Sequence, residues 1–202
     1  MRVENFDKQM QKTISELQAK GEKPTLLLHS CCAPCSTACL ERLTEFFDVT
    51  VYYYNPNLDS EKEFDMRANE QKRFCAERNL KCIVEPYVHQ EFLDVSCGLE
   101  SVKEGGARCA KCFALRLEKT ASVAKEKGLE YFTTTLTVSP LKNANLINSI
   151  GRNVENQTGV KFLTADFKKR NGYYRSVEIS KEYELYRQNY CGCEFSKNLI
   201  PK

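Results

Sequence analysis

The chain has 202 residues, 30 basic and 27 acidic side chains, a net charge of +3 and 42% hydrophobic residues. This length suits one domain with its own core, and so small a charge neither establishes nor excludes a nucleic-acid partner. No apolar run approaches the roughly 20 residues of a membrane span. The charged first residues also lack the apolar core of a secretory signal, so a cytoplasmic protein without a membrane partner is expected.

The hydrophobic pattern predicts alternating helices and strands along the chain. Apolar residues at helical spacing predict a first helix that ends near Gly21, and later helices are expected around 40–47, over 60–79, and over 108–127 before Gly128. Short apolar or β-branched runs predict strands at 25–29, 49–54, 81–86, 130–136 and 161–165. No repeat or flexible linker divides the chain. We therefore expect a single α/β domain over 1–202, with a mostly parallel sheet flanked by helices.

Several polar residues directly follow predicted strands. Cys31 and Cys32 follow the first strand, Asn55 and Asn57 the second, and Ser139 the fourth. Ligands of open parallel sheets bind beyond the carboxyl ends of the strands. These side chains are therefore expected along one functional edge of the sheet.

The composition departs from the ordinary in its eleven cysteines. In a reducing compartment, clustered cysteines indicate metal or redox chemistry rather than structural disulfides. The first cluster is HSCCAPCS (29–36), which places Cys31, Cys32 and Cys35 in a strand-to-helix turn. A helix N-terminus favours thiolates, the form that binds metal. The alternative is buried cysteines that act as small hydrophobes, and His29 beside them fits a hydrogen-bonded buried histidine better than a ligand.

A second cluster, Cys109 and Cys112, has the Cys-x-x-Cys spacing that brings two sulfurs together. A thioredoxin-like redox pair is the alternative. Both clusters together supply the four thiolates that a [4Fe–4S] cluster or a tetrahedral zinc site requires. Spacing alone leaves both metals open, although an adjacent Cys-Cys pair favours the iron–sulfur cluster, whose iron atoms lie farther apart.

A third feature is Cys191-Gly192-Cys193 near the end of the chain. Two cysteines separated by one residue can close a strained, easily reduced disulfide, which is typical of catalytic or regulatory pairs. Metal ligation and two incidental thiols are the alternatives. Of the other cysteines, Cys39, Cys75 and Cys82 are expected to pack in the core, and Cys97 is unassigned.

The segment 166–176 mixes basic and aromatic side chains. Such a mixture suits phosphate contact and base stacking. The alternative, equally weighted, is a solvated basic loop followed by an amphipathic helix. The candidate RNA-binding residues are Lys168, Lys169, Arg170, Tyr173 and Arg175.

Five motifs taken in order carry a resemblance to a known family. HSCCAPCS, YYYNPN, ARCAKC, TTTLTVSP and LYRQNYCGC occur between about residue 25 and residue 196. Together they resemble the QueH-type epoxyqueuosine reductases, and the N-terminal helix (1–22) lies outside the match. The resemblance implies reduction of epoxyqueuosine at the tRNA wobble position to queuosine. It also implies a Rossmann-like, nucleotide-hydrolase-like core, and tRNA and an electron donor as partners.

The resemblance further implies a set of site residues. The [4Fe–4S] ligands would be Cys31, Cys32, Cys109 and Cys112. The redox-active pair would be Cys191 and Cys193. Some members hold an additional iron and carry Asp where this chain has Cys35. Cys35 is therefore a candidate ligand of a second iron, and the departure leaves that metal open.

Two other functions compete with this interpretation. A zinc-stabilised RNA-binding module would use the same cysteines without catalysis. An ATP-using tRNA thiolase would need a glycine-rich phosphate loop after the first strand, where this chain has HSCCAPCS without glycine.

Overall fold

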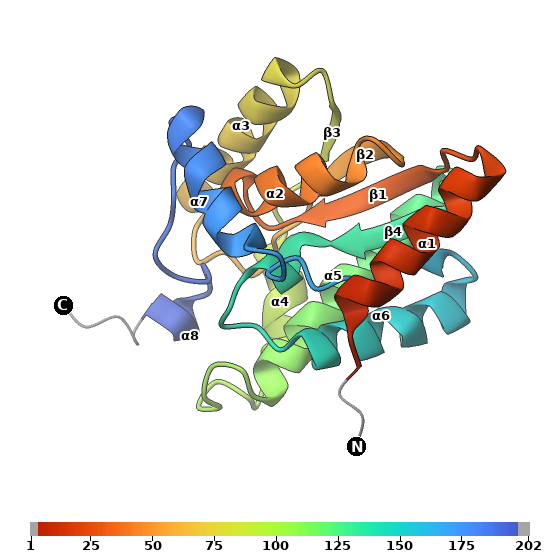
Figure 1. The fold of residues 1–202 in the computed structure, drawn as a ribbon. Helices are drawn as coiled ribbons and strands as arrows, with labels where there is room; N and C mark the ends of the chain where they lie inside the picture. Colours follow the sequence, from red (N-terminus) through yellow and green to blue (C-terminus); the bar gives the residue numbers. More distant parts are fainter. Residues whose placement is uncertain (1–3, 198–202) are drawn as a thin grey trace.

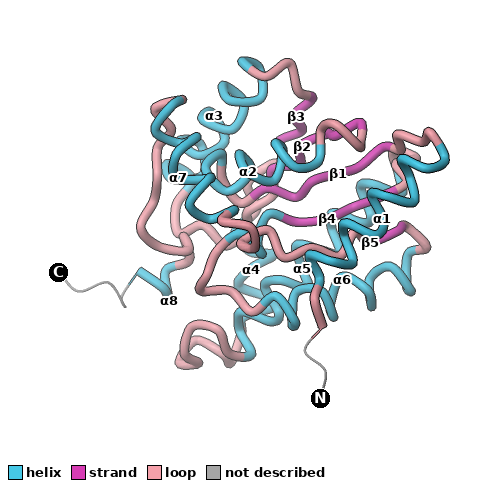
Figure 2. The backbone as a smooth tube through the Cα atoms, in the orientation of Figure 1, coloured by secondary structure: helices cyan, strands magenta, loops and turns pink. Residues whose placement is uncertain are grey.

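The computed structural model describes residues 4–197 and contains one five-stranded sheet with every neighbouring pair parallel. The strand order is β3-β2-β1-β4-β5, and helices cover both faces (Figures 1 and 2). The strands are β1 (Thr25–Ser30), β2 (Asp48–Tyr53), β3 (Lys81–Val84), β4 (Tyr131–Thr134) and β5 (Lys161–Phe162). The helices are α1 (Phe6–Lys20), α2 (Ala33–Leu43), α3 (Glu61–Glu77), α4 (His89–Ser96), α5 (Ala107–Glu126), α6 (Ala144–Thr158), α7 (Gly172–Glu182), α8 (Glu194–Lys197) and the 3₁₀ turn η1 (Thr135–Val138).

The two faces of the sheet have separate hydrophobic cores. Leu28 belongs to a core shared with α1, α2, α3 and α7, whereas Leu27 belongs to a core shared with α5 and α6. Successive strand residues point to opposite faces, so the unbroken apolar run of β1 supplies both. This confirms the prediction of an α/β fold with a parallel sheet.

The central strand β1 pairs with β2 on one side and with β4 on the other. The chain first builds outward through β2 and β3, then returns to build β4 and β5 on the opposite side. This reversal opens a crevice at the carboxyl ends of β1 and β4, where ligands of such sheets bind.

Some element boundaries differ from those predicted. The helix expected through Phe47 ends at Leu43. The strand expected over 130–136 ends at Thr134, whose hydroxyl accepts a hydrogen bond from the Leu136 amide and turns the chain into η1. Helix α6, which was not predicted, is rich in Asn and contains Gly151, so its helical propensity is weak. None of the helices within 4–197 has the length and apolarity to cross a bilayer.

Candidate metal centre

The first cysteine cluster lies in the turn between β1 and α2, as predicted. The Cys31 and Cys32 sulfurs are 4.0 Å apart, and the Cys31 backbone N–H donates to Thr135 Oγ1 at 3.3 Å. The three Sγ atoms of Cys31, Cys32 and Cys35 all lie within 4.8 Å of one another. Pro34 lies in the first turn of α2. Proline has no backbone N–H, and in the first turn this costs nothing, because the amides there have no carbonyl partner within the helix. The turn thus gathers three sulfurs at one point.

These three thiols have different proton affinities. Hydrogen bonds from the Cys32 and Cys35 thiols, aided by the charges of Lys142 and Arg116, hold the pKa of Cys31 well below its usual range. Burial raises the pKa of Cys32 to about 12, and hydrogen bonding to Cys31 raises that of Cys35. The cluster therefore stabilises one thiolate at Cys31, which is the state required of a metal ligand.

The second cluster lies on the first turns of α5. Cys109 and Cys112 face the same side of the helix, because residues three apart are neighbours on its surface. The Gly105 amide donates to Cys109 Sγ at 3.2 Å. Together with Cys191 and Cys193, these two cysteines line a small cavity of about 60 Å³. The structure therefore brings the second and third cysteine motifs to one place.

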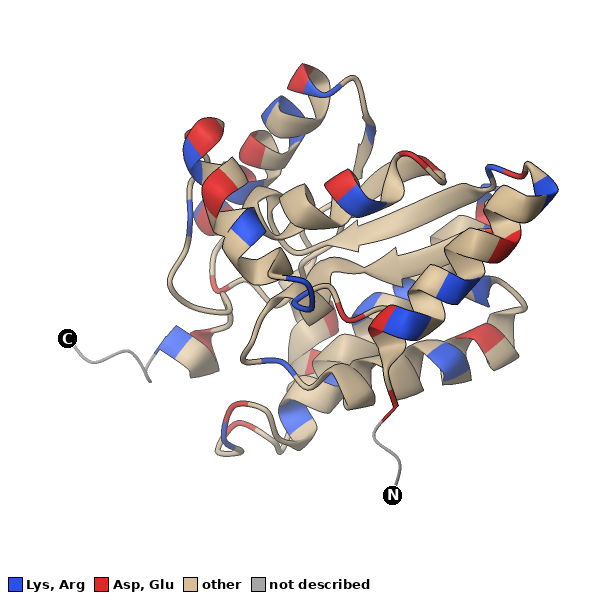
Figure 3. Cartoon of the chain, viewed as in Figure 1, with Lys and Arg blue, Asp and Glu red and all other residues tan. Residues whose placement is uncertain are grey.

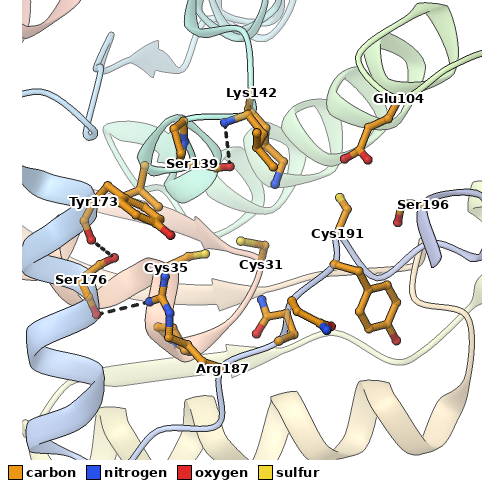
Figure 4. Close-up of a pocket in the computed structure, with 17 residues that line it drawn as sticks. Cys31, Cys35, Glu104, Ser139, Lys142, Tyr173, Ser176, Arg187, Cys191 and Ser196 are labelled. Carbon is orange, nitrogen blue, oxygen red and sulfur yellow. Dashed lines mark hydrogen bonds between the residues drawn. The ribbon is translucent and has the colours of Figure 1, made fainter. Parts of the chain in front are cut away.

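A larger cavity of about 500 Å³ adjoins this one. Its lining includes Cys31, Cys35, Tyr173 and Cys191. Figure 4 shows Cys31, Cys191 and Lys142 directed into this space. Cys191 lines both cavities, so it lies between the two groups of sulfurs. A thiol of the Cys-x-Cys motif therefore lies beside both predicted pairs of ligands, Cys31 with Cys32 and Cys109 with Cys112.

The C-terminal segment reaches the centre by anchoring to the loop before α3. The Asp59 amide donates to the Gly192 carbonyl at 2.9 Å, and the Asp59 carboxylate pairs with Lys197 at 2.7 Å. Upstream, Gln188 Nε2 donates to Cys32 Sγ at 2.9 Å. Sequence reasoning missed Gln188, whose only signal was its place inside the YRQNYCGC motif.

Two cations lie beside the sulfurs. The Arg116 side chain, 1% exposed, donates to Asn55 Oδ1 at 2.5 Å and to Asn57 Oδ1. Lys142 lines both cavities. The prediction that Asn55 and Asn57 lie at the functional edge is confirmed. Arg116 was missed, although its spacing of four residues from Cys112 puts it on the same helix face.

His29 is a hydrogen-bonded buried histidine, as favoured from the sequence. Its Nδ1 is 2.8 Å from Thr134 Oγ1, and its Nε2 is 3.1 Å from the Tyr54 carbonyl. The carbonyl can only accept, so Nε2 carries the hydrogen and Nδ1 accepts from the hydroxyl. Burial lowers the pKa of His29 to about 3 and keeps the ring neutral. Both ring nitrogens are used, which leaves none for a metal.

The predicted basic segment is not a free loop throughout. Tyr173 and Arg175 belong to α7, along which acidic and basic positions alternate in the coloured ribbon of Figure 3. Lys168 pairs with Asp166 at 2.9 Å and Arg170 with Asp7 at 2.9 Å, while Arg175 pairs with acidic residues of α2 and α7. Lys169 lines a separate surface hollow. Tyr173 faces the cysteine cavity, beneath the Arg187 guanidinium at 5.5 Å.

The cysteines outside these clusters behave as expected from the sequence. Cys39 and Cys75 are buried in the core around α2 and α3, and half-buried Cys82 packs against it. Cys97, which was unassigned, is exposed.

The family model and the similar proteins agree on one family. A family model described as epoxyqueuosine reductase QueH matches residues 26–199. The epoxyqueuosine reductase QueH of Staphylococcus epidermidis is 44% identical over 200 residues, covering 95% of this chain and 84% of the relative. That of Thermotoga maritima is 37% identical over 178 residues, covering 85% of this chain and 90% of the relative.

One solved structure has a similar fold. It is the U34-tRNA thiolase NcsA from Methanococcus maripaludis with its [4Fe-4S] cluster, with a TM-score of 0.53 and 13% identity. The match covers 95% of this chain and 68% of that chain. The family model matches residues 26–199, which include the cysteine motifs, and two relatives are 43–44% identical over at least 95% of this chain, so the chain belongs to the epoxyqueuosine reductase QueH family.

Proposed function

We propose that this protein reduces epoxyqueuosine in tRNA to queuosine, using an iron–sulfur cluster bound by Cys31, Cys32, Cys109 and Cys112. The observation that carries the proposal is the convergence of three cysteine motifs on two adjoining cavities at the carboxyl edge of the sheet. Membership of the family supports the substrate, and the gathered cysteines support the metal.

The residues present fit a sulfur-ligated, negatively charged group. Thiolates are the ligands that iron–sulfur clusters and zinc prefer. Arg116 Nε and Asn57 Nδ2 are buried and have no hydrogen-bond partner among residues 4–197, as expected where an acceptor completes the site. Cluster ligands bind different iron atoms, so the two pairs of cysteines need not meet at one point.

The reaction requires two electrons and two protons, because the epoxide oxygen leaves as water and an alkene remains. When bound, the cluster supplies electrons one at a time. Closure of Cys191 and Cys193 to a disulfide releases two electrons and two protons together, which matches the need of one turnover. An external reductant then returns the disulfide to the dithiol. The position of Cys191 in the lining of both cavities supports this role.

Cys35 is the proposed ligand of an additional iron. Its sulfur lies within 4.8 Å of those of Cys31 and Cys32, and it lines the larger cavity. A Cys35→Ser variant is expected to lose one iron per chain while it retains the cluster spectrum. Unchanged iron content would refute this assignment.

The proposal is tested on protein purified without oxygen, by iron and acid-labile sulfide content and by conversion of epoxyqueuosine-containing tRNA. About four irons and four sulfides per chain are expected for the cluster, with queuosine as product. A colourless protein with one zinc and no conversion would favour the zinc-stabilised RNA-binding module instead.

Three variants separate the roles of the cysteines. Cys109→Ser is expected to lose iron, because a ligand is removed. Cys191→Ser is expected to keep iron but fail after at most one turnover, because the dithiol cannot form its disulfide. Cys97→Ser, at an exposed position, is the matched control and should retain both. Repeated turnover by Cys191→Ser would refute the relay.

A further inference from the structure

Arg116 is a buried cation whose hydrogen-bond partners are neutral. Its side chain is 1% exposed, and its guanidinium donates to the Asn55 and Asn57 side-chain oxygens. Its Nε has no partner. Within residues 4–197, no carboxylate forms an ion pair with it.

The two other buried arginines, Arg67 and Arg108, have different partners. Arg67 pairs with Glu63 at 2.7 Å, whereas Arg108 donates to the backbone carbonyls of Leu99, Glu100 and Val102. Buried charges in proteins are normally paired or bind an ion, because an uncompensated charge is costly to desolvate. Among the described residues, the Arg116 side chain donates to two amide oxygens and leaves its Nε without an acceptor, so a negative charge that belongs to the site itself would complete its surroundings.

Arg116 is connected to the cysteines through its own helix and through Asn57. Cys112 lies one helical turn before it on α5, and Asn57, which it holds, lines the small cavity beside Cys109 and Cys191. Burial opposes the charge of Arg116. The nearby thiols of Cys112, Cys191 and Cys31 favour the charge of Arg116 when they are ionised, and they raise its pKa. Asn57 thus connects the guanidinium to the small cavity that Cys109, Cys112 and Cys191 line.

We propose that Arg116, held by Asn55 and Asn57, is the counter-charge of the metal centre and raises its reduction potential. This inference rests on the proposed function, and it makes Arg116 a positioning residue rather than a catalytic one. Reduction adds one electron to an already anionic group. A fixed positive charge nearby stabilises the reduced form more than the oxidised form.

The expected effect is large enough to measure. At an effective dielectric constant of about 20, a unit charge within about 12 Å of another changes an equilibrium roughly tenfold. For a one-electron couple, tenfold corresponds to about 59 mV. Loss of the Arg116 charge is therefore expected to lower the midpoint potential by about this amount or more.

The first test changes the partner rather than the arginine. Asn57→Asp keeps the oxygen that accepts from Arg116 and replaces the unpartnered amide nitrogen with a second oxygen, so it adds a neutralising charge at almost constant shape. Arg116→Gln removes the charge, and Arg116→Lys retains it. Arg42→Gln removes an arginine that pairs with a carboxylate, that of Asp7, as the control.

The midpoint potential is measured by dithionite titration, followed by electron paramagnetic resonance, on each anaerobically reconstituted protein. Asn57→Asp and Arg116→Gln are expected to be at least tenfold harder to reduce, while Arg116→Lys and Arg42→Gln stay within about twofold of wild type. Unchanged potentials in Asn57→Asp and Arg116→Gln would overturn the inference and leave the proposed function intact.

Iron content distinguishes the other outcomes. If both Arg116 variants and Asn57→Asp lose iron yet keep the wild-type circular dichroism spectrum, shape rather than charge is decisive, and the inference is overturned. If the wild-type protein itself binds no iron after reconstitution, the proposed function fails and the inference fails with it.

Discussion

Gly192 determines the backbone conformation between Cys191 and Cys193, and its replacement by alanine tests how tightly that conformation is confined. Its φ is +108°, and a Cβ added there would lie 2.3 Å from Leu58 Cδ2 and 3.0 Å from Arg67 Nη1. A positive φ costs an alanine about 1–2 kcal/mol, and overpacking costs about 1–3 kcal/mol. Gly192→Ala is therefore expected to lower the free energy of unfolding by about 2–5 kcal/mol.

The assay is urea-induced unfolding, followed by circular dichroism under reducing conditions. Gly98→Ala is the matched control, because Gly98 has a φ of +73° but no atom within 4 Å of the added Cβ. That control carries only the backbone cost of about 1–2 kcal/mol. If the two variants lose the same stability, Leu58 and Arg67 do not confine the Cys-Gly-Cys segment and the reasoning is wrong.

Three further outcomes follow from the packing and the surface charge. Gly151→Ala gains about 1 kcal/mol of helix propensity but places a Cβ 2.3 Å from the Phe162 ring. Its melting temperature should therefore fall, and a second change, Phe162→Leu, should recover it. Asn148→Ala should cost about 2–4 kcal/mol in urea unfolding, because the buried amide bonds two carbonyls and one backbone amide. If the charges of this segment serve ion pairs within the protein, the double variant Lys168→Glu with Lys169→Glu should bind tRNA within about twofold of wild type. A large loss of affinity that depends on salt would instead establish the segment as an RNA contact.

The sequence predicted the sheet well, because its central strands are nearly continuous apolar runs bounded by clear turns. Clustering of Cys31, Asn55 and Asn57 followed from one rule, that parallel strands end at a common edge. Helix α6 was missed because Asn and Gly lower its propensity, and its stability comes from packing on α5 rather than from local preference.

Local sequence patterns could not predict side-chain contacts between residues that are far apart in the chain. Arg170 looked like a free cation, but it pairs with Asp7, 163 residues away. Gln188 meets Cys32 across 156 residues. Such pairings depend on how α1, α2 and the C-terminal segment pack together, so they appear only once the tertiary structure is known.

The position of β1 in the middle of the sheet also determines the order in which the protein can assemble. The β1–β2–β3 half joins segments close in sequence, whereas the Cys31 amide bonds to Thr135 across 104 residues. Closing a loop of that length costs about 4 kcal/mol from its length alone. Contacts of such long range form slowly. A nascent chain can therefore complete one half of its sheet, with Cys31, Cys32 and Cys35 already in one turn, before Cys109, Cys112, Cys191 and Cys193 join them.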